Sequence, residues 1–170
     1  MPCEISTGYQ RKQCANAGGV RAVYVANYSD VASITLDTTN KAKATAITML
    51  AGKKFYRIGV EPEVANFSIT REVNPQGRTM FYSATLNLSL PVQNENDVNW
   101  IDLISRGVSI FIVEMNDGTR RIIGHEFGCT ASGDESSGTA FGDPHVANLA
   151  FTTKSAFPPP YFTGTMPDVE

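Results

Sequence analysis

Residues 108–127, VSIFIVEMNDGTRRIIGHEF, contain two β-rich runs separated by Asn116-Asp117-Gly118. Asp-Gly between such runs is a strong hairpin signal, because the turn needs a positive φ, which glycine adopts without penalty. The polar stretch SGDESSG at 132–138 then predicts a loop, and the run that ends LAFTT at Thr153 predicts a final strand. The region therefore predicts antiparallel β-structure.

The chain before this hairpin shows the same β pattern. β-Branched and aromatic runs predict strands at 20–28, 31–36, 47–50 and 54–60. Residues 37–45 show no clear period, which predicts either a long loop or a stretch that becomes ordered only against a partner.

A long hairpin is predicted from 64–73 and 82–90, joined by the type I turn signal Asn74-Pro-Gln-Gly77. The even positions of 82–90 are apolar, and the odd positions carry small, uncharged polar residues. This period of two predicts one buried and one wet face. The wet face suits an ordinary solvated sheet, or a surface that lines a lumen or faces another subunit.

A helix is predicted at about 95–106. Asn94 can cap its start, Gly107 can end it, and Val98, Ile101 and Ile104 lie three apart on one face that can dock on a sheet. The predicted fold is therefore mainly β, an antiparallel β-sandwich or barrel with one short α-helix.

Length and composition predict one folded domain. The 170 residues are 42% hydrophobic and 18% charged, which argues against global disorder. We expect an N-terminal arm at 1–19, a single β domain at 20–157 and a tail at 158–170. That tail is either flexible or clips onto the edge of a neighbouring subunit.

The net charge and the number of cysteines argue against several classes of protein, including nucleic-acid-binding proteins and disulfide-rich secreted proteins. The net charge is −3 and no basic stripe is present, so phosphate-backbone binding is not predicted. The three cysteines, Cys3, Cys14 and Cys129, form no disulfide framework. With no basic and apolar leader and no long apolar run, we expect neither a signal peptide nor membrane binding, and a cytoplasm-like compartment.

The sequence contains no convincing catalytic or metal-binding site. His125-Glu-Phe-Gly-Cys129 resembles half of a zinc-protease helix motif, but glycines interrupt it and cysteine replaces the second histidine. His125, Cys129 and His145 would bind zinc only if their strands converged. A Cys129–His125 nucleophile pair on one strand would be separated by roughly 13 Å.

The segment 133–138 lacks the ligand spacing of a calcium loop. We therefore predict no catalytic, cofactor-binding or metal residues, no cofactor and no enzymatic activity. A small metal-dependent hydrolase is the alternative from another class.

Several stretches carry a family resemblance. They are RIIGHEFGCT at 121–130, SGTAFGD at 137–143, VANLAFT at 146–152, GGVR at 18–21 and VYVANY at 23–28. Together with the order of elements, they resemble the tail tube (major tail) proteins of tailed bacteriophages, in particular those of phages with Bacteroidetes hosts.

The resemblance implies a structural protein of the virion tail, assembled in the host cytoplasm. Six subunits would pool their sheets into one barrel, and the rings would stack head to tail into a conduit for DNA delivery. Its partners would be further copies of itself and other tail or head–tail proteins, with DNA only as non-specific passing cargo.

Within that resemblance, the polar face of 82–90 would line the lumen. Residues 37–46 or 51–63 would reach the next ring, and 132–138 would lie on the outer or stacking surface. The arm with Cys3 and Cys14 departs from the family pattern, so a head–tail adaptor, a tail terminator or a capsid decoration protein are alternatives.

Overall fold

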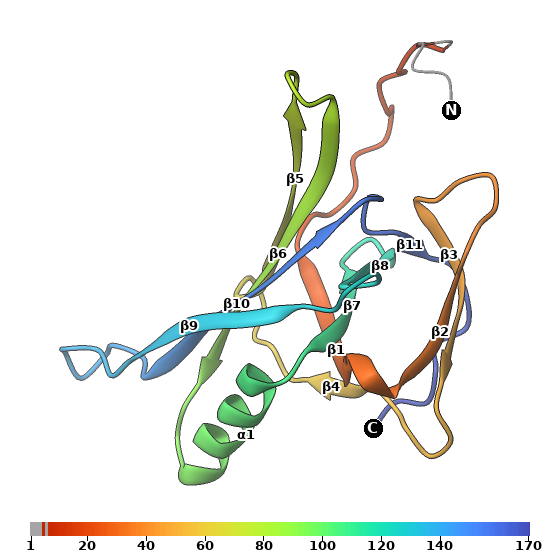
Figure 1. Ribbon diagram of the computed structural model, residues 1–170. Coiled ribbons are helices and arrows are strands. Elements are labelled where there is room, and N and C mark those ends of the chain that lie inside the picture. The colour runs from red at the N-terminus through yellow and green to blue at the C-terminus, as the bar shows by residue number, and fades with distance from the viewer. Residues whose placement is uncertain (1–4, 6) are drawn as a thin grey trace.

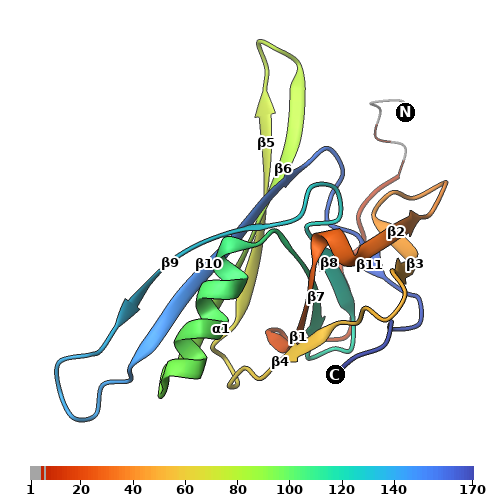
Figure 2. The same ribbon diagram turned by 60° about the horizontal axis from the view of Figure 1, so that its bottom comes forward.

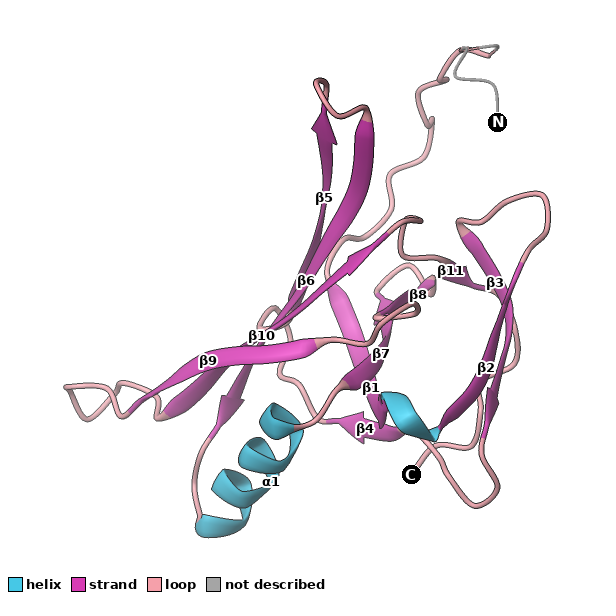
Figure 3. Ribbon diagram, in the orientation of Figure 1, coloured by secondary structure: helices cyan, strands magenta, loops and turns pink. Residues whose placement is uncertain are grey.

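The computed structural model describes residue 5 and residues 7–170 (Figure 1). Within this part of the chain the protein is mainly β, with two sheets and one α-helix, as the sequence predicts (Figure 3). All strand pairs are antiparallel except β3 with β11. The elements are β1 (Val20–Asn27), a 3-10 turn (Tyr28–Asp30), β2 (Val31–Leu36), β3 (Lys43–Met49), β4 (Tyr56–Ile58), β5 (Asn66–Asn74), β6 (Thr79–Pro91), α1 (Glu95–Arg106), β7 (Ser109–Met115), β8 (Arg120–Ile123), β9 (Thr130–Ser136), β10 (Val146–Ser155) and β11 (Tyr161–Phe162).

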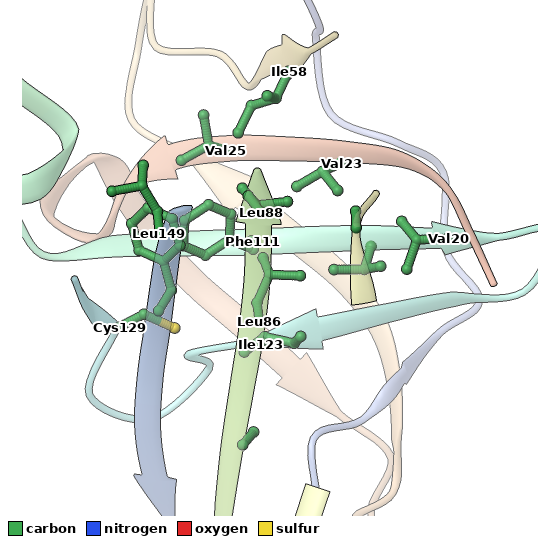
Figure 4. Close-up of a cluster of buried hydrophobic side chains, with 14 of the residues drawn as sticks. Val20, Val23, Val25, Ile58, Leu86, Leu88, Phe111, Ile123, Cys129 and Leu149 are labelled. Atoms are coloured by element: carbon green, nitrogen blue, oxygen red, sulfur yellow. The ribbon is translucent and has the colours of Figure 1, made fainter. Parts of the chain in front are cut away.

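The larger sheet has the order β2-β3-β11-β8-β7-β1-β4, and the smaller one has the order β5-β6-β10-β9. The first hydrophobic core lies between them (Figure 4). Phe111 of β7 meets Phe151 of β10 there, with ring centroids 4.5 Å apart and a tilted geometry that aromatic pairs favour. Burial of each such ring stabilises the fold by about 1.5–3 kcal/mol.

The second core lies on the other face of the larger sheet, which curls around it (Figure 2). Ile110 and Ile112 of β7 point into this core, whereas Phe111 and Val113 point into the first. Because β7 is buried on both faces, its sequence is a continuous apolar run rather than an alternating one.

Two hairpins extend beyond the body in different directions (Figures 1 and 2). The β5–β6 hairpin is in register from Asn66↔Asn87 to Asn74↔Thr79, as the turn signal predicts. The β9–β10 hairpin projects to the side. The alternation in β6 is also as predicted: Ala84, Leu86, Leu88 and Leu90 are buried, and the residues between them are partly exposed.

The prediction of a loop at 132–138 is wrong. Thr130–Ser136 is β9, and its residues pair with β10 from Thr152↔Thr130 to Val146↔Ser136. The sequence of β9 lacks the apolar residues that usually identify a strand. β9 lies at the edge of its sheet and most of its residues are exposed, so it needs little apolar surface. At Gly133 the partner backbone comes so close that a Cβ would lie 2.2 Å from the carbonyl oxygen of Asn148.

Two other boundaries differ from expectation. The strand expected at 47–50 begins earlier, at Lys43, because β3 pairs with β2 through Leu36↔Ala44. Residues 158–170, expected to be flexible or to clip onto a neighbouring subunit, are instead paired and packed within their own domain. Tyr161–Phe162 lies between β3 and β8, Phe162 fills the second core, and Val169 bridges to Phe55.

The helix has the predicted bounds and cap. Asn94 accepts hydrogen bonds from the amides of Asn96 and Asp97, and the Asp97 carboxylate accepts one from the Asn94 amide, which makes a capping box. The expected buried stripe is only partly present. Ile101 and Ile104 pack against the first core, whereas Val98 is 43% exposed.

Candidate assembly surface

The structure does not bring His125, Cys129 and His145 together. Among the described residues, no group of three or more His, Cys, Asp or Glu side chains is placed to hold a metal ion. Gly124–Phe127 forms a turn after β8, so the strand geometry assumed for a Cys129–His125 pair does not apply. His145 instead contacts Glu135, with Nε2 and Oε1 2.8 Å apart across the β9–β10 hairpin.

The His125–Cys129 run has a structural role. The Glu126 carboxylate accepts hydrogen bonds from the amides of Ala156 and Phe157, at 2.9 and 3.2 Å, and so fixes the segment after β10. Burial lowers the pKa of His125, with the Glu126 carboxylate opposing this shift. Burial raises the pKa of the Cys129 thiol to about 12, so at neutral pH this sulfur is not a nucleophile.

The outer face of the smaller sheet is the most distinctive surface of the molecule. One row across its four strands reads Ser68, Thr85, Thr152 and Thr130, all hydroxyl residues. The alternation of the strands places the following residues on this face: Asn66, Ser68, Thr70, Glu72 and Asn74 of β5; Thr79, Phe81, Ser83, Thr85, Asn87, Ser89 and Pro91 of β6; Thr130, Ser132, Asp134 and Ser136 of β9; and Val146, Asn148, Ala150, Thr152 and Lys154 of β10.

This polar face carries almost no charge. Its ionisable residues are Glu72, Asp134 and Lys154. Polar side chains bond to each other across strands: Asn87 donates to Asn66 at 2.9 Å, and Ser89 donates to Asn148 at 2.8 Å. Short hydroxyl and amide side chains therefore occupy most of this face, and its three ionisable side chains carry both signs of charge.

The strands β5 and β9 are the two edge strands of the same sheet, and α1 lies beside β9. Within the described chain β5 pairs only with β6, and β9 pairs only with β10. Each edge therefore presents unpaired backbone N–H and C=O groups, and a long open edge is a template for a further strand. The two edges lie at opposite sides of one sheet, so strand addition at both would generate a ring or a filament.

The sequence indicated only part of this surface. The polar face of β6 is visible in the alternation at 82–90, but the second edge is hidden in the stretch at 132–138. In this strand both faces carry small residues: Thr130, Ser132 and Asp134 on one face, and Ala131 and Gly133 on the other. Because neither face has large apolar side chains, the sequence shows no hydrophobic periodicity there.

Among the described residues, no helix has the length and apolarity that a membrane crossing requires. Comparison of the chain with models of known protein families, with curated proteins and with solved structures finds no significant match to any of them.

Proposed function

We propose that this chain is a virion structural protein that forms a phage tail tube. Subunits assemble into rings by adding β5 of one copy to β9 of the next, and rings stack into a conduit for DNA delivery. The observation that carries the proposal is the polar, nearly uncharged face of the smaller sheet, flanked by two open edges.

Edge-to-edge pairing gives each open strand a partner. A closed ring of such sheets has no free edge, which removes the aggregation hazard that two exposed edges pose. The number of subunits expected from the family resemblance is six. The proposed site of action is the virion tail, after assembly in the host cytoplasm.

The face that would line the lumen fits a passage for DNA. A lumen rich in Lys and Arg would bind phosphates through counterion release and retard the cargo. Here Lys154 is offset by Glu72 and Asp134, and short hydroxyl and amide groups occupy most other positions. DNA would be non-specific passing cargo rather than a ligand.

The test is direct imaging. Size-exclusion chromatography with light scattering, followed by negative-stain electron microscopy over a range of protein concentrations, should show rings and stacked tubes. Rings that never stack would indicate a head–tail adaptor or a tail terminator, and isolated trimers would indicate a decoration protein. A monomer at the highest concentration would overturn the proposal.

A matched pair of variants tests the edge contact. Ser68 lies on the open strand β5, and its cross-strand neighbour Thr85 lies on the central strand β6. Lysine on an edge strand disfavours further pairing. Ser68→Lys should therefore raise the concentration needed for ring formation more than Thr85→Lys, which adds the same charge to the same face. Equal effects of the two changes would show that β5 is not in the interface.

A further inference from the structure

A hollow lies between α1 and the edge strand β9, on the side of the smaller sheet that faces the first core, here called the body side. Its volume is about 410 Å³, and its walls include Val98, Ile101, Ala131, Gly133 and Leu149. At its centre β9 carries only alanine and glycine on this side, so the strand does not fill the space. Packed interiors leave few voids larger than a water molecule. The hollow therefore suits side chains of another polypeptide.

The exposure of Val98 belongs to the same feature. Ile101 and Ile104, which follow it on the apolar stripe of α1, pack against the first core, whereas Val98 lines the hollow and is 43% exposed. The stripe is thus left incomplete at the end of the helix that borders the hollow. An apolar side chain entering the hollow would complete it.

The charged side chains beside the hollow already have partners. Asp102 forms an ion pair with Arg106 at 2.8 Å, and Glu135 contacts His145 at 2.8 Å. The occupant therefore need not supply a charge. Its contact with Val98 and the other apolar walls decides the fit.

The other edge strand, β5, has large side chains that its own domain covers only in part. Its register with β6 places Phe67, Ile69, Arg71 and Val73 on the body side, the side of the buried Leu86. Phe67 and Ile69 pack at the margin of the first core and stay partly exposed, and Val73 is 63% exposed. Beyond the body, the β5–β6 hairpin thus presents apolar side chains that no part of the described chain covers fully (Figure 1).

The strand directions allow the two edges to meet. Neighbouring strands in the order β5-β6-β10-β9 are all antiparallel, so β5 and β9 run in opposite directions. In a ring of copies related by rotation, β5 of one copy is therefore antiparallel to β9 of the next, and the alternation of strand directions continues. Because side chains alternate between faces with a period of two, the body-side residues of both strands then lie on one face.

The two edges are also offset along the strand direction. One row across the sheet joins Ser68 of β5 to Thr130, the first residue of β9. From this row β5 continues to Asn74, whereas β9 continues the opposite way to Ser136. Strands of a closed barrel tilt and are staggered by a fixed shear. A neighbour displaced along the strands therefore brings the free part of β5, residues 69–74, beside β9 and its hollow.

We propose that the body-side side chains of β5, Ile69 and Val73 in particular, fill the hollow between α1 and β9 of the adjacent copy in the ring. This inference rests on the proposed function, because it names the side chains that make the contact between edge strands specific. Backbone hydrogen bonds repeat along a strand and fix its register only weakly. Side chains that enter a hollow bounded by α1 select one register.

Photocrosslinking identifies the occupant of the hollow. The photoreactive residue p-benzoylphenylalanine replaces Arg71, which lies between Ile69 and Val73 on the same side of β5. A small fraction of this variant is assembled with an excess of isotopically labelled wild-type protein. The expected product joins position 71 to α1 or β9 of a labelled copy, located by mass spectrometry. In preparations that contain rings, a crosslink to any other segment of a labelled copy, or none to a labelled copy, would overturn the proposal.

Filling the hollow from its own chain provides the second test. Ala131→Leu places a larger side chain on the body side of β9, in the space that β5 of the neighbour would occupy. It should raise the protein concentration needed for ring formation at least about tenfold, as loss of an interface hot spot does. Ala150→Leu is the matched control, because it adds the same group to the polar face of the adjacent strand β10. This control should assemble as the wild type does.

A change on the other partner tests the same contact without altering the hollow. Val73 is mostly exposed in the single copy, so Val73→Ser should leave the unfolding temperature of the subunit unchanged and still raise the concentration needed for rings. Val73→Ile should assemble as the wild type does. Wild-type ring formation by both Ala131→Leu and Val73→Ser would overturn the inference alone. Absence of rings from the wild-type protein would instead overturn the proposed function, so the two failures are distinguishable.

Discussion

Gly133 shows how a single residue allows the open edge to form. It lies in β9 opposite Leu149, and a Cβ at this position would meet the Asn148 carbonyl oxygen at 2.2 Å. The obstacle is backbone rather than a flexible side chain, so a larger residue must push the two strands apart.

Gly133→Ala should therefore lower the free energy of unfolding by about 1–3 kcal/mol, the usual cost of inserting a methyl group into a tight contact. Amide hydrogen exchange should accelerate in β9 and the paired part of β10. Gly142→Ala is the matched control, because it lies in the same hairpin with nothing within 4 Å of the added Cβ. Similar losses for both variants, measured by urea denaturation, would contradict the prediction.

The buried thiol of Cys129 predicts a pH dependence. Burial raises its pKa to about 12, above the value of about 8.5 for a free cysteine. Between these values the unfolded chain loses the proton and the folded chain keeps it, so this group costs stability as the pH rises. Cys129→Ala should show a smaller loss of stability from pH 8 to pH 10 than the wild type. An equal loss would contradict the prediction.

The same burial predicts selective labelling. At pH 8, iodoacetamide should modify the exposed Cys14 rapidly and Cys129 only after denaturation, as peptide mass spectrometry can show.

The N-terminal cap contributes much of the stability of the helix α1, because no residue of the helix is fully buried. The capping box of Asn94 and Asp97 satisfies the first amides. Such an element opens locally without unfolding the domain.

Asn94→Ala should destabilise α1 by about 0.5–2 kcal/mol. The expected result is faster amide exchange at Glu95–Arg106 with little change in the two cores, and a change in the fluorescence of Trp100, the only tryptophan. Asn99→Ala, on the exposed surface of the same helix, removes no cap and should leave exchange unchanged or slower. Faster exchange in both variants would contradict the role of the cap.

At the level of elements, the sequence correctly predicted the strands, turns and helix that have strong local sequence signals. The turn at 74–77, the alternation at 82–90 and the cap at Asn94 each correspond to an observed element. β9 and β11 were missed for a common reason. Each forms a strand only because of the strands beside it. β9 pairs with β10, and Tyr161–Phe162 pairs with both β3 and β8. Local patterns carry no information on such long-range pairing.

At the level of the whole molecule, the assembly surface could be predicted only in part. The sequence indicated a polar face on one strand. The structure extends that face over four strands and adds two open edges. A groove beside α1 is likewise lined by residues that are far apart in the chain, among them Val25, Tyr56 and Trp100, so only the folded chain shows it.

Ring formation should respond little to salt. In the proposed assembly, rings are held by backbone pairing between the edge strands β5 and β9 rather than by pairs of charged side chains. The Debye length falls from about 8 Å at 0.15 M to about 3 Å at 1 M, so attraction between exposed charges weakens over this range of salt concentration. Rings imaged by negative stain should therefore keep their diameter and their number as NaCl rises from about 0.15 M to about 1 M. Rings that dissociate over this range would show that charged side chains, rather than strand pairing, hold neighbouring subunits together.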